Sequence, residues 1–313
     1  KQGEALEALS SFRQALERDL HNEDASKQLT RLLEKDELFE EAFVQEYFEE
    51  VDVLWVVDNS GSMSSAQQQV MNNFQSFIGG FSALALDYHI AIVSTDMDNP
   101  AQSGKFVAPV ITTDDPDPYA SFLTAVNLGT CGSGSEKGFD ATYAALTEPL
   151  LSTTNADFLR EDAALATIVV TDEDDDSSLR PGNFASWYNG LKSDPDRATF
   201  SAICGDPGFT GCLDPFGTGV IASPGNLYVD AVDQTSGIWQ SICTNAFDDA
   251  LQHLSVTAAG MSYEFALSRD PSSIASLTVS VDGTEVPYAL NDGWVYDADT
   301  NSVVFNGEAI PGP

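Results

Sequence analysis

The chain has 313 residues, enough for one large or two modest domains with a buried core. Its formal net charge of −36, from 13 basic and 49 acidic residues, argues against nucleic acid and anionic membrane as partners, because both would be repelled. No apolar run approaches the length of a transmembrane helix. Because the chain begins at Lys1 and ends at Pro313 inside a β-rich stretch, we expect a processed chain or a fragment.

The first segment, residues 1–48, is acidic and has the spacing of helices. Apolar residues recur at helical intervals in two stripes with a polar break between them, and three phenylalanines continue the second stripe. The residues are Leu6, Leu9, Phe12, Leu16, Leu29, Leu32, Leu33, Phe39, Phe43 and Phe48. The pattern predicts a helical segment that packs on the main domain or on a partner.

Residues 51–63 carry the pattern around which the rest of the chain is arranged. The mostly apolar run 51–57, rich in Val, predicts a strand that is buried on both faces. Asp58, Ser60 and Ser62 follow at every second position, and Gly61 lets the backbone turn between them. One carboxylate and two hydroxyls can therefore share one small space. Such an oxygen-only set suits Mg²⁺ or Ca²⁺ better than Zn²⁺.

Strands and helices then alternate through residues 49–260. The pattern predicts strands at 88–94, 106–111, 165–171, 199–204 and 237–242, with the second of these antiparallel at an edge, and helices at 70–81, 119–126, 136–146, 183–193, 228–234 and 245–258. This alternation predicts an α/β domain with a doubly wound, mostly parallel central sheet. Ligands bind such sheets at the carboxyl ends of the strands, which is where Asp58 lies.

The Asp-x-Ser-x-Ser loop after a Val-rich strand resembles the metal-ion-dependent adhesion site (MIDAS) of von Willebrand factor type A (VWA) domains. In that family a Thr from a second loop and an Asp after a further hydrophobic strand complete the site. This chain has Gly129-Thr130 before a helix and Asp172 after the strand 165–171, in the same order. The resemblance implies that Asp58, Ser60, Ser62, Thr130 and Asp172 hold a metal.

The chain departs from the family pattern in two places. Ser133 matches the family's distance from the second-loop hydroxyl to the first buried helix residue, Phe139, better than Thr130 does, so both stay candidate ligands. The family usually has Gly after the Asp, but here the acidic run 173–176 follows Asp172. This run predicts either a solvated loop or a second cation that relieves the repulsion between carboxylates.

The resemblance implies a Rossmann-like VWA fold and a function without catalysis, namely divalent-cation-dependent protein–protein binding (adhesion). It also implies a bacterial protein that is extracellular or at the cell surface, with outer-membrane anchoring or a periplasmic location as further options. The cation, Mg²⁺ or Ca²⁺ with Mn²⁺ also possible, would accept a Glu or Asp from a protein partner. The alternative is a structural subunit of a surface assembly or filament. No Gly-x-Ser-x-Gly, His-Glu-x-x-His or Walker motif is present to favour an enzyme.

Four cysteines lack Cys-x-x-Cys spacing, and the chain has only three His, which argues against zinc and thioredoxin-type redox sites. An even number in a sequence like that of a surface protein favours disulfides and an oxidising compartment, and buried free thiols are the alternative. Spacing alone allows three connectivities. The resemblance to bacterial surface proteins implies the pairs Cys212–Cys243 and Cys131–Cys204.

After residue 260 the apolar pattern changes to period two. Residues 277–281 and 285–288 predict a hairpin with its turn at Asp282-Gly283, and residues 294–296 and 303–305 predict another. This tail resembles the start of a small β-sandwich module that follows the adhesion domain in related bacterial proteins. We therefore predict three parts: a helical segment 1–48, a VWA domain 49–260 and an incomplete all-β module 261–313.

Overall fold

A computed structural model describes residues 39–213, 221–244 and 246–313, and the chain divides into two compact units, Lys1–Val44 and Gln45–Pro313. Most of the predicted helical segment 1–48 lies outside the described residues. Its last part, residues 39–48, forms no helix, so that part of the prediction is wrong. The reason is tertiary: the Phe48 N–H donates to the Ala259 carbonyl, and the Gln45 amide donates to the carbonyls of Ser262 and Pro311.

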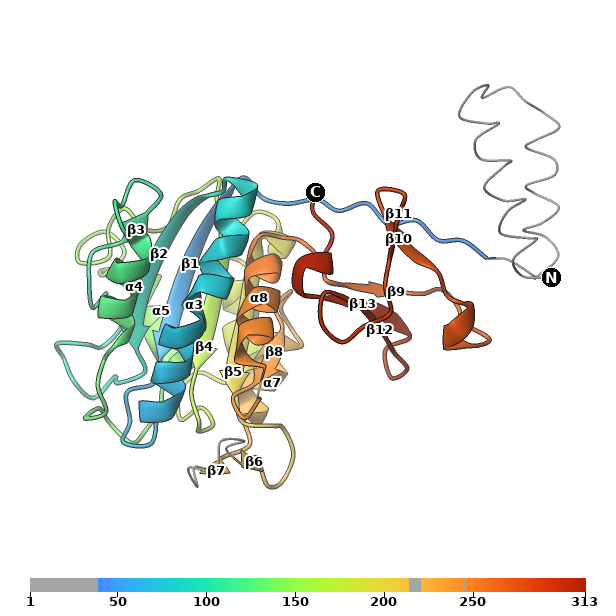
Figure 1. Cartoon of the computed structure of the whole chain (residues 1–313). Helices are drawn as coiled ribbons and strands as arrows, with labels where there is room; N and C mark the ends of the chain where they lie inside the picture. Colours follow the sequence, from blue (N-terminus) through green and yellow to red (C-terminus); the bar gives the residue numbers. More distant parts are fainter. Residues whose placement is uncertain (1–38, 214–220, 245) are drawn as a thin grey trace, which may run out of the picture. The chain divides into compact units, whose positions relative to one another are not determined.

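A six-stranded sheet lies at the centre of the second unit (Figure 1). Its strands occur in the order β3-β2-β1-β4-β5-β8, and all neighbours are parallel except β3, which is antiparallel to β2 at the edge. The strands are β1 (Glu50–Val57), β2 (Asp87–Ser94), β3 (Ile111–Thr112), β4 (Ala164–Val170), β5 (Ala198–Cys204) and β8 (Trp239–Ser241). The chain order reverses between β1 and β4, and such a switch point is where α/β sheets bind ligands.

Helices cover both faces of this sheet, which confirms the predicted α/β class (Figure 1). One face packs against α3 (Ser64–Leu84), α4 (Pro118–Val126) and α8 (Phe247–Ala258), and the other against α5 (Gly138–Ala145), α6 (Pro181–Tyr188) and α7 (Asn226–Val232). On the first face the Trp55 ring meets Phe77 and Phe122 edge-on. Leu54 packs on the second face with Phe139. Strand β1 is therefore buried on both sides, as its apolar run predicts.

The four central strands form within one residue of the predicted bounds. Of the predicted strand 106–111, only Ile111 lies in a strand, β3, and the Phe106 N–H donates to the Asn155 side chain. The predicted helix 136–146 begins only at Gly138, and the Lys137 N–H before it donates to the Thr95 carbonyl at the end of β2. No helix among the described residues is long and apolar enough to cross a membrane.

The remaining elements are short. Strands β9 (Glu264–Ala266), β12 (Gly293–Asp297) and β13 (Ser302–Asn306) form a three-stranded sheet, β10 (Val279–Val281) pairs with β11 (Thr284–Val286), and β6 (Cys212–Leu213) pairs with β7 (Ile221–Ala222). Three 3₁₀ turns span Pro195–Arg197, Ile274–Ser276 and Gly307–Ala309. Asp282 and Gly283, between β10 and β11, both have positive φ (50° and 77°), as a tight hairpin turn requires. Both predicted hairpins of the tail are present.

Candidate metal centre

Asp58 follows directly after β1 and is fully buried. Its N–H donates to the Val170 carbonyl of the neighbouring strand β4, 2.9 Å away. One carboxylate oxygen accepts the Ser60 N–H at 2.7 Å, and the other accepts the Thr171 hydroxyl at 2.7 Å. Burial raises the pKa of Asp58 to about 6, since the loss of solvation outweighs these hydrogen bonds.

The two serines connect Asp58 to Asp172 across the switch point. The Ser60 and Ser62 hydroxyls lie 3.3 Å apart, and the Ser62 hydroxyl donates to Asp172 at 3.1 Å. Burial also raises the pKa of Asp172. Ser62 is exposed, whereas Asp58, Ser60 and Asp172 are buried. The structure thus brings four predicted ligands into one hydrogen-bonded set, with an opening to solvent at Ser62.

The second loop is attached to the first at two points, and Thr130 lies between them. The Gln67 amide of α3 donates to the carbonyls of Asp58 (2.8 Å) and Gly129 (3.0 Å). The Gly132 N–H donates to the Asn59 carbonyl at 2.8 Å. A Cβ at Gly132 would lie 2.2 Å from the Asn59 side-chain oxygen, so any larger residue here would have to displace the Asn59 amide. Within the described part of the chain, the Thr130 hydroxyl has no hydrogen-bond partner.

Ser133 is engaged elsewhere. Its hydroxyl donates to Asp98 at 2.9 Å and accepts the Ser135 N–H at 3.2 Å. Its own N–H donates to Asp96 at 3.3 Å. These acceptors belong to the loop after β2, and Lys137 pairs with the same Asp98 at 2.7 Å. The hydrogen bonds among the described residues therefore join neither Ser133 nor Thr130 to the set of Asp58, Ser60, Ser62 and Asp172.

The acidic run after Asp172 is neither fully solvated nor a second cage. Asp175 is buried and accepts hydrogen bonds from the Phe139 N–H (3.2 Å) and from the N–H and hydroxyl of Ser177 (2.8 and 3.1 Å). Burial nevertheless raises the pKa of Asp175 to about 6. Asp174 accepts the Leu227 N–H at 2.9 Å. These two carboxylates anchor α5 and α7, and the described residues contain no group of three His, Cys, Asp or Glu placed to hold a metal.

Three residues of the site were not predicted from the sequence. Thr171 donates to Asp58, Gln67 bridges the first two loops, and the Asn59 carbonyl receives the second loop. The sequence carries a signal for Gln67, because this glutamine stands at helical spacing from the apolar Val70 and Phe74. In the structure it lies on the same buried side of α3 and is 4% exposed. A polar residue in an apolar stripe indicates a buried hydrogen-bond partner.

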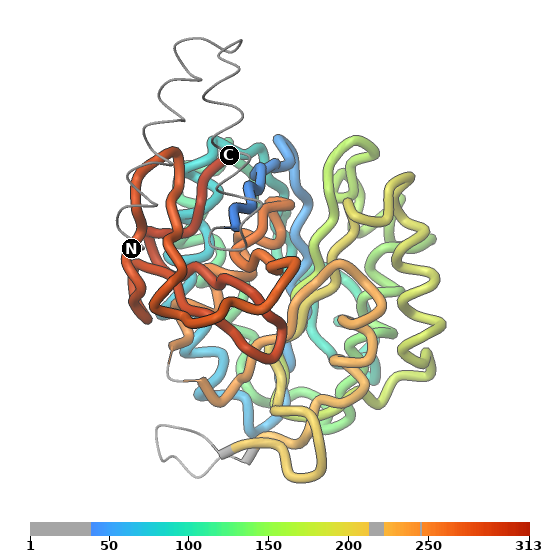
Figure 2. The backbone as a smooth tube through the Cα atoms, turned by 90° about the vertical axis from the view of Figure 1, so that its right-hand side faces the viewer, coloured from blue at the N-terminus to red at the C-terminus, as the bar shows by residue number. Residues whose placement is uncertain are grey.

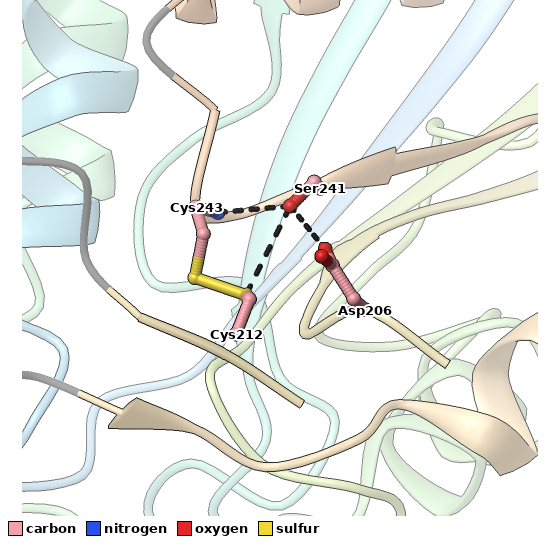
Figure 3. Close-up of a disulfide and its surroundings, with 4 residues drawn as sticks. All are labelled: Asp206, Cys212, Ser241 and Cys243. Carbon is pink, nitrogen blue, oxygen red and sulfur yellow. Dashed lines mark hydrogen bonds between the residues drawn. A yellow bond between two sulfur atoms is a disulfide. The ribbon is translucent and has the colours of Figure 1, made fainter. Parts of the chain in front are cut away.

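The loop that follows β5 lies at the same end of the sheet as the β1–α3 connection, as both views show (Figures 1 and 2). The Ser223 N–H from this loop donates to the Asp172 carbonyl at 2.8 Å. The predicted Cys212–Cys243 disulfide is present, and the Ser241 hydroxyl accepts the Cys243 N–H at 3.2 Å and donates to Asp206 (Figure 3). The disulfide ties this loop to the segment after β8.

The predicted Cys131–Cys204 disulfide is wrong. Both residues are free thiols: Cys131 is exposed in the second loop, whereas Cys204 is fully buried at the end of β5. The Cys204 sulfur packs against Gly225, where a Cβ would lie 2.5 Å from it. Burial raises the pKa of the Cys204 thiol to about 12. Cys204 is packed in the core and Cys131 is exposed, so the two sulfurs form no disulfide.

No family model matches this chain, and no curated protein matches it. Among solved structures it is similar to proximal thread matrix protein 1 from the mussel byssus, at 13% identity and a TM-score of 0.42, over 77% of this chain and 52% of that chain. A second structure of that protein gives 16% identity and a TM-score of 0.41, over 70% and 49% of the two chains.

A third structure, described as having a zinc-occupied MIDAS motif, gives 17% identity and a TM-score of 0.40, over 76% of this chain and 52% of that chain. This chain therefore spans about half the length of each of these three structures. Its α/β fold follows from its own strand order and helix layers.

Proposed function

We propose that this chain is a VWA-type module that binds a protein partner through a divalent cation and has no catalytic function. The observation that carries the proposal is the hydrogen-bonded set of Thr171, Asp58, Ser60, Ser62 and Asp172 at the switch point of the sheet. Two strands that are adjacent in space but far apart in sequence deliver these groups to one place.

The groups fit a hard cation. Two carboxylates and two hydroxyls offer only oxygen, which is the donor set that Mg²⁺, Ca²⁺ and Mn²⁺ prefer. Asp58 and Asp172 supply the negative charge, and Ser60 and Ser62 add neutral oxygens. When bound, the cation would keep a coordination position on the side open to solvent at Ser62, where it would accept a carboxylate from the partner.

Thr130 is the proposed ligand of the second loop, in preference to Ser133. The attachments at Gly129 and Gly132 hold Thr130 beside the first loop, and its hydroxyl is not committed to any described residue. The hydroxyl of Ser133 is committed to Asp98. A threonine would extend the oxygen-only donor set without adding charge.

The proposed partner is a protein that presents Glu or Asp, and the proposed location is extracellular or at a cell surface. With a net charge of −36, the chain would repel an acidic partner unless a cation intervened. The Cys212–Cys243 disulfide supports an oxidising compartment. A cation-dependent contact is therefore the arrangement that suits both the acidic surface and the site.

Titration calorimetry tests the cation. The EDTA-treated chain should bind at least one of Mg²⁺, Ca²⁺ and Mn²⁺, and at 100 times Kd the free energy of unfolding should rise by about 2.7 kcal/mol. Asp58→Ala should lose both effects. Asp176→Ala is the matched control, because it removes an exposed carboxylate of the same loop and should keep both. A wild-type chain that binds none of the three ions would overturn the proposal.

A peptide array tests the partner class. Immobilised peptides with Glu or Asp at one position are compared with their Gln or Asn counterparts, with cation and with EDTA. We expect capture that needs both the cation and the acidic residue and that Asp58→Ala abolishes. Self-assembly of the chain that is equal in wild type and Asp58→Ala, with no acid-dependent capture, would instead indicate a structural subunit.

A further inference from the structure

Glu136 occupies a fixed position behind the proposed cation site. It lies between the second loop and α5, and its side chain is 1% exposed. Its carbonyl accepts the Asp176 N–H at 2.7 Å, from the loop after β4. The next residue, Lys137, donates its N–H to the Thr95 carbonyl after β2, 3.2 Å away, and the Thr95 N–H donates to the carbonyl of Val57, the residue before Asp58, also at 3.2 Å. Loops from two strands therefore hold Glu136 in place.

The carboxylate of Glu136 has no donor. Among the described residues, no N–H or O–H reaches either of its oxygens. Its electrostatic neighbours are two further carboxylates, those of Asp58 and Glu173. Glu136 and Glu173 can share a hydrogen bond only when one of them carries a proton. The adjacent lysine, Lys137, is turned to Asp98 at 2.7 Å and pairs there.

This arrangement costs stability as it stands. A buried polar group without a partner costs about 1–3 kcal/mol, and more if it is charged. The buried Asp175 nearby shows what a structural carboxylate requires, since it accepts three hydrogen bonds. Glu136 has the burial of Asp175 without the donors. A positive charge beside Asp58 would offset this cost.

We propose that Glu136 is an outer carboxylate of the cation site, which strengthens cation binding by supplying negative charge from behind Asp58. The inference rests on the proposed function, because it assumes a cation at the set of Asp58, Ser60, Ser62 and Asp172. Carboxylates outside the direct ligand shell of a metal commonly orient the ligands and adjust the affinity of the site. Glu136 would place a third negative charge near the cation.

Two effects of opposite sign follow from this role. Without a cation, burial and the neighbouring carboxylates of Asp58 and Glu173 raise the pKa of Glu136 to about 8. The folded chain must then either hold a proton on Glu136 or suffer the repulsion, so removal of this carboxyl group should stabilise the fold. With a cation, the same charge is favourable, so its removal should weaken binding. Removal of a residue that served only the packing of the second loop would not produce these two effects together.

The test uses the full chain with Glu136→Gln, which keeps the shape and removes the charge. We expect Kd for Ca²⁺ and Mg²⁺, measured by calorimetry, to rise about 10- to 100-fold. The urea midpoint in EDTA should rise, because the amide can donate to Glu173. Glu136→Asp, which keeps the charge on a shorter side chain, should have an intermediate Kd.

Asp175→Asn is the matched control, because it neutralises a buried carboxylate of the same region that already has its donors. It should lower the urea midpoint and leave Kd unchanged. A Glu136→Gln chain with the wild-type Kd, or one that is less stable in EDTA, would overturn this inference while the proposed function stands. A wild-type chain that binds no cation would overturn both.

Discussion

Strand β1 has a buried carboxylate at each end, and the two have different hydrogen-bond partners. Asp52, near its start, and Asp58, just after its end, are both fully buried. Asp52 accepts the Arg160 side-chain Nε–H and the Arg160 backbone N–H, each at 2.7 Å. Asp58 accepts one hydroxyl and one backbone N–H. Burial raises the pKa of both carboxyls, but only at Asp52 does a guanidinium oppose the rise.

The difference separates a structural carboxylate from one that fits an added cation. At the amino end of the sheet the chain supplies its own positive charge, since Arg160 also lies 3.2 Å from Asp87 and 3.6 Å from Glu50. At the carboxyl end, in the part of the chain that the structure describes, no Lys or Arg forms an ion pair with Asp58 or Asp172. In the proposed function a divalent cation takes the place that Arg160 has at the other end.

The largest expected effect comes from removing the ion pair between Arg160 and Asp52. Arg160→Ala should lower the free energy of unfolding by about 3–5 kcal/mol, because it removes the guanidinium from the buried Asp52 and leaves it the backbone N–H of residue 160. Urea denaturation measures this change. Arg197→Ala is the control. The Arg197 guanidinium donates to the Asp162 carbonyl at 2.6 Å and lies over the Phe48 ring, so its removal does not take a charge partner from a buried carboxylate. Equal losses of unfolding free energy in Arg160→Ala and Arg197→Ala would contradict the role of Arg160 as the charge partner of the buried Asp52.

The next effect is on pH dependence without a cation. Because the folded-state pKa of Asp58 is about 6 and its ordinary value is 3.8, the folded chain holds this proton more strongly than the unfolded chain does. The resulting stability is fully present below about pH 4 and is lost as pH rises through about 6. Two pKa units correspond to about 3 kcal/mol.

Urea midpoints in EDTA between pH 4 and 8 measure this dependence. Asp175, whose pKa is also raised to about 6, contributes in the same direction, so the test is the difference between wild type and Asp58→Asn. The variant should lose the Asp58 part of the slope. Cation binding should weaken as pH falls through about 6, because protons compete for the same carboxylates. Parallel slopes in the two chains would contradict the raised pKa of Asp58.

The smallest effect sharpens the assignment within the second loop. Thr130→Ala should weaken cation binding and change the stability of the cation-free chain little, because its hydroxyl has no partner among the described residues. Ser133→Ala should do the reverse, keeping Kd and costing about 1 kcal/mol for the hydrogen bond to Asp98. Calorimetry and urea denaturation of this matched pair distinguish the two. If Ser133→Ala alone raises Kd, then Ser133 is the ligand.

Local patterns were enough to predict the four central strands of the main domain and the helix that follows the first of them. Residues 51–57 carry their own signal for a doubly buried strand, and the period of apolar residues after Ser62 identifies α3. The spacing of Asp58, Ser60 and Ser62 is also local, since all three belong to one short loop. By contrast, the helical pattern around Phe43 and Phe48 was misleading, because contacts with Ala259 and Ser262 hold that segment without a helix.

The apolar runs alone predicted the ends of β1 and β4 to within one residue, and hence that Asp58 and Asp172 reach the same edge of a parallel sheet. The residues that surround these two carboxylates depend on long-range contacts. In the folded chain the Ser133 hydroxyl donates to Asp98, and Cys204 is buried whereas Cys131 is exposed. The buried carboxylate of Glu136 has no hydrogen-bond donor among the described residues. The reason is that strand and helix periods act over a few residues, whereas a side chain's partner depends on which distant loops converge on it.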